Sequence, residues 1–295
     1  MWKPLLLVSG LTLLGAGGII YTKAFDPFLS GSAQLAAAGP NTPAAFPESD
    51  PDNLVRTKKQ VPLEGTADEL VKQGDVFDLQ FKPTEALRFY LPAEVKDPKN
   101  AAILLRIARQ FRHQMADAPA ANEKTRLAGM ALDYAQRAVA LAPGDSEAHL
   151  SIAICHAKSI EILTNKEKMD ALRQVKASAD KAIALDPSNH LAWYILGRWH
   201  QQVAAMGGVK RKVAEMAYGE LPDASDEDAA KCFLKANSLD PKRSVYLVDL
   251  GITYAAMGEE GKARTCIEKG LALPSTGKDD PKTYQRGKET LKTLE

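Results

Sequence analysis

The sequence predicts an all-α protein in which helix pairs stack on one another as an α-solenoid. Four segments end in similar runs, AEVKDP, AVALAP, AIALDP and ANSLDP, which close at Pro98, Pro143, Pro187 and Pro241. Small residues recur at a fixed distance before each proline, where they would let two helices approach closely. The prolines themselves would end the second helix of each pair. A chain of 295 residues with 45% hydrophobic residues is large enough for such a core.

The repeating pattern resembles the tetratricopeptide repeat. The alanines at the fixed distance are Ala93, Ala138, Ala182 and Ala236. The W-x-x-L-G core that this repeat carries in its first helix is complete at Trp193, Leu196 and Gly197. We expect five such repeats over residues 67–277 and a C-terminal capping helix over residues 278–295. This number exceeds the roughly three repeats that a continuous core needs.

The N-terminal segment has the composition of a membrane anchor. Residues 4–22 read PLLLVSGLTLLGAGGIIYT and contain no charged side chain over 19 positions. A helix of that length covers roughly 28 Å, which is close to the bilayer core of about 30 Å. We therefore expect a transmembrane signal anchor over residues 1–24. A cleaved signal peptide remains the alternative, with small residues at 30–38 as its cleavage region.

The next segment predicts a flexible linker. Residues 25–66 hold six prolines among Ala, Ser, Asp and Asn, with little apolar periodicity. Because this composition cannot bury enough apolar surface to fold, we expect a disordered, Pro/Ala-rich linker. Anchor and linker would hold the repeats outside the bilayer. The membrane would be the bacterial inner membrane, with the domain facing the periplasm, or an organelle membrane if the protein is eukaryotic.

The charged residues, cysteines and histidines do not form the motifs of a catalytic or metal site. The 38 basic and 37 acidic residues nearly balance, so we expect no nucleic-acid partner. Cys155, Cys232 and Cys266 form no CxxC motif, and His149 and His156 occupy packing positions without an HExxH motif. No nucleophile stands with a base and an orienting group. We therefore expect a protein that is not an enzyme, with no catalytic residue, metal or cofactor.

The most informative positions for binding lie on the first helix of each pair. In such repeats the second, fifth, ninth and twelfth positions of that helix line an inner groove. The candidate ligand-groove residues are Arg109, Arg112, Leu150, Ile154, Tyr194, Arg198, Val248 and Ile252. Asp68, Asp75 and Asp78 of the first repeat would form an acidic rim. An apolar groove with arginines fits an acidic amphipathic peptide or a lipid with an anionic head group. The chain's own insertions or tail could instead fill the groove, and the sequence leaves both interpretations open.

The stretch WYILGRW, residues 193–199, contains both packing positions and groove positions of the repeat. Trp193 and Leu196 occupy packing sites of the repeat, whereas Tyr194 and Arg198 fall on groove positions. Trp199 has no role in the repeat pattern. The binding prediction therefore concentrates on Arg198, with Tyr194 beside it.

Three further motifs resemble the regulator of microtubule dynamics family, including its prokaryotic relatives. These are LGRWHQQVA at 196–204, AYGELPDAS at 217–225 and EDAAKCFLKANSLDP at 227–241, and the similarity runs from about residue 67 to the C-terminus. The resemblance implies a non-enzymatic helical-repeat domain that acts through protein partners and is membrane-anchored in some relatives. For membrane-tethered eukaryotic relatives it also implies phospholipid handling at organelle contacts.

Together these observations predict a membrane-anchored scaffold that mediates protein–protein interaction. Its partners would be proteins or peptides, with the membrane engaged through residues 4–22. Microtubules would be a partner only if the protein is eukaryotic. The alternative is a module that binds or transfers anionic phospholipid through the groove, using Arg109, Arg112 and Arg198.

Overall fold

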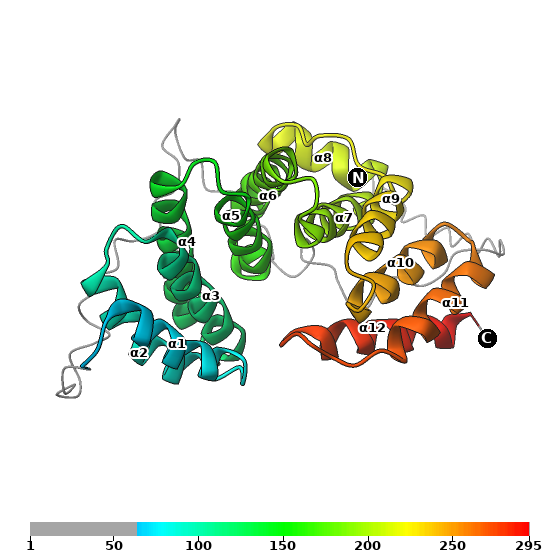
Figure 1. Cartoon of the computed structure of the whole chain (residues 1–295). Coiled ribbons are helices and arrows are strands. Elements are labelled where there is room, and N and C mark those ends of the chain that lie inside the picture. The colour runs from blue at the N-terminus through cyan, green and yellow to red at the C-terminus, as the bar shows by residue number, and fades with distance from the viewer. Residues whose placement is uncertain (1–63, 295) are drawn as a thin grey trace, which may run out of the picture. The chain divides into compact units, whose positions relative to one another are not determined.

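The computed structural model describes residues 64–294, and these residues form helices and connecting turns without a strand. The helix pairs are α1 (Ala67–Asp78) with α2 (Pro83–Lys96), α3 (Ala101–Asp117) with α4 (Ala121–Leu141), α5 (Ser146–Ser159) with α6 (Asn165–Leu185), α7 (His190–Ala204) with α9 (Asp226–Leu239), and α10 (Ser244–Ala256) with α11 (Glu260–Leu271). Each pair contacts the next along the chain, as Figure 1 shows. The predicted all-α class is confirmed for this part of the chain.

Small residues account for the close packing within the pairs. The four alanines at fixed distance from the prolines, Ala93, Ala138, Ala182 and Ala236, are all fully buried. A Cβ atom on Gly197 would lie 2.7 Å from the Phe233 ring, and one on Gly251 would lie 2.6 Å from Ile267. Larger side chains at these glycines would separate α7 from α9 and α10 from α11. The small residues are therefore required by the close approach of the helices.

Polar side chains mark where many helices begin. Thr66 and Glu69 form a capping box at the start of α1, and Thr164 and Glu167 form another at the start of α6. The side chain of Asn189 accepts a hydrogen bond from the Ala192 amide at the start of α7. Such caps satisfy amide groups that the first turn of a helix leaves without a partner. Local sequence thus sets the start of these helices independently of the packing.

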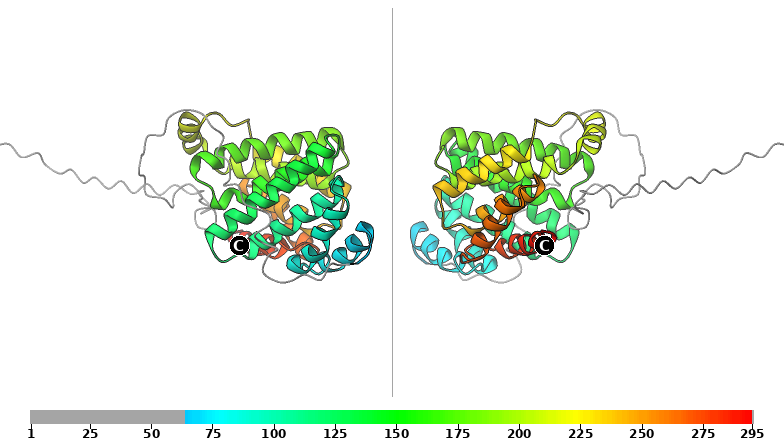
Figure 2. Two further views of the ribbon diagram at one scale, coloured as in Figure 1. Left: turned by 90° about the vertical axis from the view of Figure 1, so that its left-hand side faces the viewer. Right: turned by 90° about the vertical axis from the view of Figure 1, so that its right-hand side faces the viewer.

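Extra residues lengthen the second and third pairs and add a helix to the fourth. α3 has 17 residues, and α4 and α6 have 21 residues each. A short 3-10 helix, η2 (Ile160–Ile162), lies between α5 and α6. In the fourth pair the extra residues form α8 (Gly208–Tyr218), which contacts α6 at the edge of the helix pairs (Figure 1, Figure 2).

The C-terminal segment forms α12 (Asp280–Thr293), which packs on α10 and α11. The predicted anchor over residues 1–24 lies outside the described residues, and so does the predicted linker up to residue 63. Among the helices of residues 64–294, none combines the length and the apolar character needed to cross a bilayer.

Candidate functional site: the inner face of the first helices

The first helices of the pairs share one face, which we call the inner face. α3 contacts α5, α5 contacts α7, and α7 contacts α10. Hydrogen bonds link Arg112 on α3 to Ser151 on α5, and Arg198 on α7 to Asp249 on α10. Side chains from distant parts of the sequence therefore meet on this face.

In the last pairs, α12 covers the inner face. Val248 and Ile252 of α10 are buried in a cluster whose other members come from α11 and α12, including Tyr284 and Leu291. At Gly287 of α12 a Cβ atom would lie 2.7 Å from the Val248 side chain. The tail of the chain thus fills this part of the predicted groove, which was one of the two interpretations that the sequence left open.

A buried charge cluster joins α7, α10 and α12. The carboxylate of Asp249 is 0% exposed, and Arg198 Nη1 donates to both of its oxygens at 3.1 Å. The Tyr194 hydroxyl donates to the same carboxylate at 2.8 Å, and Arg286 of α12 forms a second ion pair with it. Burial alone would raise the pKa of Asp249, but the two arginines and the tyrosine hold this pKa below its ordinary value. Arg198 and Tyr194 therefore already have an internal partner.

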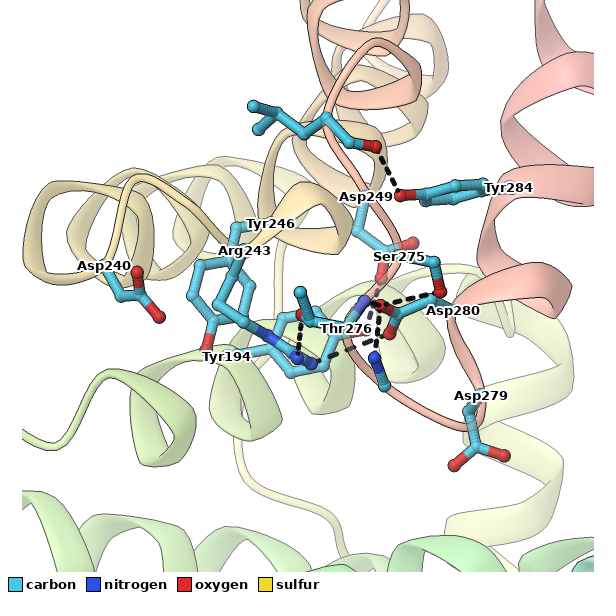
Figure 3. A network of polar contacts seen from close by, with 12 residues as sticks. Tyr194, Asp240, Arg243, Tyr246, Asp249, Ser275, Thr276, Asp279, Asp280 and Tyr284 are labelled. Carbon is cyan, nitrogen blue, oxygen red and sulfur yellow. Dashed lines mark hydrogen bonds and ion pairs between the residues drawn. The ribbon is translucent and has the colours of Figure 1, made fainter. Parts of the chain in front are cut away.

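The loop before α12 is fixed by the carboxylate of Asp280 (Figure 3). Asp280 accepts hydrogen bonds from the backbone amides of Thr276 at 2.8 Å and Gly277 at 2.7 Å. Arg243 of the turn before α10 lies 3.6 Å from the same carboxylate. Tyr284 donates to the Leu273 carbonyl at 2.9 Å across the loop. These contacts set the position from which α12 starts.

The same loop also reaches back to the second and third pairs. Lys278 donates to the carbonyl of His113 at 3.1 Å and forms an ion pair with Asp117, both on α3. Asp279 forms an ion pair with Lys158 on α5. The loop therefore contacts two helices that lie more than 100 positions before it in the sequence.

Arg112 differs from Arg198 in its partners. It is only 7% exposed, and its Nη1 donates to Ser151 Oγ at 2.9 Å and Cys155 Sγ at 3.5 Å. Both acceptors are uncharged, and Arg112 forms no ion pair with the residues of 64–294. Burial, followed by the charges of Arg112 and Lys158, lowers the pKa of His113 to about 4. Arg112 therefore has uncharged acceptors, and its own charge is among the causes that lower the pKa of the neighbouring His113.

The acidic rim predicted for the first pair is partly neutralised. Arg109 forms an ion pair with Asp78, and Arg106 Nε donates to Asp75 at 2.8 Å. The Tyr90 hydroxyl donates to the same Asp75 at 2.6 Å. Arg109 itself remains exposed, so its ion pair is open to competition from a ligand.

The remaining candidates occupy the middle of the inner face. Leu150 is buried, whereas Ile154 on the same helix is partly exposed. Three residues of importance were absent from the prediction: Arg106, Asp249 and Arg286 pair with inner-face groups. The signal for Asp249 was present in the sequence, since one acidic residue interrupts the apolar run SVYLVDLGITYAA.

Trp199 has a packing role that the repeat pattern did not indicate. It is among the largest fully buried side chains, and its Nε1 donates to the Leu172 carbonyl of α6 at 2.7 Å. Trp193, which the pattern placed in the core, is partly exposed and donates to the Pro187 carbonyl at 3.0 Å. The two tryptophans of the stretch 193–199 therefore serve the fold.

The solved structures with a similar fold include a tetratricopeptide-repeat (TPR) protein. A thermophilic TPR protein of Thermus thermophilus matches with a TM-score of 0.54 and 15% identity, covering 77% of this chain and 99% of that one. The pilF protein of Pseudomonas aeruginosa matches with a TM-score of 0.50 and 13% identity, covering 77% and 88%. At these identities the likeness concerns the fold alone, and it agrees with the predicted tetratricopeptide-type solenoid.

Relatives in sequence carry a common name. Regulator of microtubule dynamics protein 1 of Mus musculus is 28% identical over 229 residues, which cover 77% of this chain and 74% of the relative. The protein of the same name in Caenorhabditis elegans is 26% identical over 189 residues, covering 64% and 83%. The family model described as regulator of microtubule dynamics protein 1-3 matches residues 65–295. The chain therefore belongs to the regulator of microtubule dynamics family.

Proposed function

We propose that this chain is a membrane-tethered, non-enzymatic scaffold that binds an acidic peptide segment of a protein partner on the inner face of α3 and α5. The observation that carries the proposal is Arg112, a buried guanidinium whose acceptors are the uncharged Ser151 and Cys155. A buried charge without a counterion is costly, and a ligand carboxylate would supply that counterion.

The surroundings of Arg112 fit a peptide. Leu105 and Ile154 are partly exposed apolar residues on the same face and could hold the apolar side chains of an amphipathic ligand. Arg109 is exposed, with Asp78 as its exchangeable partner. A guanidinium binds a carboxylate through two parallel hydrogen bonds, which fixes the position of the ligand.

Anionic phospholipid is the other ligand that the arginines could accept. A lipid would also need an apolar trough for its chains, and Val248 and Ile252, which the sequence offers for that trough, are covered by α12. This burial favours the peptide. The tetratricopeptide fold and the regulatory name of the relatives also support a role in protein–protein interaction.

The tether in this proposal is the predicted anchor over residues 1–24, with its apolar core at residues 4–22. The membrane would be an organelle membrane in a eukaryote or the inner membrane in a bacterium, with the domain in the periplasm. Microtubules enter as a partner only in the eukaryotic case.

The test uses the full chain in detergent and a panel of acidic amphipathic peptides, with binding followed by fluorescence anisotropy. Arg112→Met should weaken binding about thirtyfold, because the carboxylate loses its partner. Arg88→Met, which changes an exposed arginine of α2, serves as the matched control and should have no effect. Equal binding by wild type and Arg112→Met would refute the proposal. Phospholipid that co-purifies with wild type and is lost in Arg112→Met would favour the lipid alternative instead.

A further inference from the structure

The added helix α8 carries apolar side chains on its outer face. Val209 is 80% exposed, Val213 is 63% exposed and Met216 is 89% exposed. Their spacing of four and three residues places them on one side of the helix. The buried residue of α8 is Ala214. This helix thus presents an apolar stripe, defined here as Val209, Val213 and Met216, away from the protein.

Hydrogen bonds on the other side of α8 hold the stripe outward. Arg211 Nε donates to Glu215 at 2.7 Å, and its Nη2 donates to the Leu221 carbonyl at 2.9 Å. Arg173 of α6 donates to the carbonyls of Tyr218 and Gly219, each at 2.6 Å, at the C-terminal end of α8. These hydrogen bonds therefore hold α8 in place through its polar side. Figure 2 shows α8 at the edge of the helix pairs.

Basic residues border the stripe, whereas the acidic partners of Arg211 lie on the opposite side of α8. Lys212 is exposed and lies beside the stripe by helical position, and Lys210 lies on its opposite border. The acidic residues are on the far side, because Glu215 bonds Arg211 and Asp223 lies 3.6 Å from the same guanidinium. An apolar stripe bordered by lysines is the arrangement of a helix that lies in the surface of an anionic membrane.

We propose that α8 docks on the surface of an anionic bilayer, with the stripe in the boundary between head groups and acyl chains and Lys212 at the head groups. This docking rests on the proposed function, because the affinity of α8 for the bilayer depends on the membrane tether. Three small apolar side chains bind a membrane only weakly, but a tethered domain meets the bilayer at a high effective concentration. If residues 25–66 form the linker that their composition predicts, a chain of that length spans on the order of 35 Å, which would let α8 reach the surface.

The experiment measures amide hydrogen exchange in residues 208–218 of the full chain reconstituted into vesicles. Phosphatidylcholine vesicles with phosphatidylserine are compared with vesicles of phosphatidylcholine alone. Exchange in α8 should slow about fivefold or more on the anionic vesicles, since each lysine near the surface contributes about a factor of five. Met216→Asp and Lys212→Glu should each abolish this protection. Val95→Asp, at an apolar residue of α2 that is 81% exposed, is the matched control and should keep it.

Three outcomes would overturn the proposal. Exchange in α8 could be the same on both kinds of vesicle, or the protection could persist in Met216→Asp. Protection could also occur in detergent together with self-association in sedimentation, which would assign the stripe to a second copy of the chain. The tether is tested separately, by flotation of the vesicles after extraction at alkaline pH. Loss of flotation with α8 protected at high vesicle concentration would reject the anchor and keep the docking surface.

Discussion

Arg112 and Arg198 both extend from a first helix into the inner face, but they meet different partners. Arg198 bonds both oxygens of the buried Asp249, which Arg286 of α12 also contacts. Arg112 bonds the uncharged Ser151 and Cys155. The same residue type thus pairs with a buried carboxylate in the last pairs, whereas in the second and third pairs it has no ion-pair partner among residues 64–294.

This difference follows from where α12 lies. The last pairs use their inner face for packing, because α12 buries Val248 and Ile252 there. The earlier pairs meet the loop before α12, through Lys278 and Asp279. The tail of the chain therefore covers the inner face of the last pairs, and the proposed peptide site lies on the part of this face that α3 and α5 form.

The largest expected effect comes from Asp249→Asn. This change removes the counterion of two arginines at a fully buried site, and breaking such a pair costs about 3 kcal/mol of the free energy of unfolding. Urea unfolding followed by circular dichroism measures it. Asp133→Asn, at an exposed residue of α4, is the control and should change stability by less than about 0.5 kcal/mol. A small effect at Asp249 would show that the cluster contributes little to holding α12.

The two arginines themselves give the second prediction. Arg198→Met leaves Asp249 with one arginine fewer, so the free energy of unfolding should fall by about 2 kcal/mol. Arg112→Met removes a buried charge for which residues 64–294 supply no counterion, so stability should change by less than about 1 kcal/mol. Comparable losses in the two variants would contradict the distinction between a structural and a ligand-binding arginine.

The pH dependence of His113 gives the third prediction. The pKa of His113 is about 4 in the folded protein against an ordinary value of 6.5. The unfolded chain therefore takes up this proton first, so stability is full above pH 6.5 and falls as the pH drops toward 4. Between pH 7 and pH 5 the contribution of His113 changes by about 2 kcal/mol.

Denaturant unfolding of wild type and His113→Gln at both pH values isolates this contribution. The loss of stability at pH 5 should be smaller in His113→Gln by that amount. Arg112→Met should also raise the pKa of His113, because the charge of Arg112 is one of the causes that lower it. An unchanged pH dependence in both variants would contradict the effect of burial and of the Arg112 charge on the pKa of His113.

The sequence predicted the scaffold more completely than the site. The alanines before each proline and the glycines at 197 and 251 are local signals, since each pair of helices has the same steric requirement. Arg198 and Arg112 were both chosen by their position in the repeat, and position alone does not distinguish them. Their difference depends on Asp249 and Arg286, which come from other helices.

The path of α12 could not be derived from its own composition. The spacing of Tyr284 and Leu291 gives this helix one apolar side, but it does not indicate that the helix covers Val248 on α10. The loop that directs it depends on Asp280, which bonds two backbone amides and faces Arg243 of another turn. Long-range polar contacts of this kind leave no periodic pattern in the sequence.

The smallest expected effect tests the packing of α12 at Gly287. A Cβ atom there would lie 2.7 Å from Val248 and 3.2 Å from Ile267. Gly287→Ala gains helix propensity of about 1 kcal/mol but introduces overpacking of about 2 kcal/mol, so the protein should lose about 1 kcal/mol.

Gly261→Ala provides the control, because apart from the backbone of α11 itself nothing lies within 4 Å of a Cβ at Gly261. Thermal unfolding should therefore shift in opposite directions, with a lower midpoint for Gly287→Ala and an unchanged or higher one for Gly261→Ala. Equal shifts would mean that α12 does not pack closely against α10 in solution. Val248 and Ile252 would then return as candidate ligand contacts.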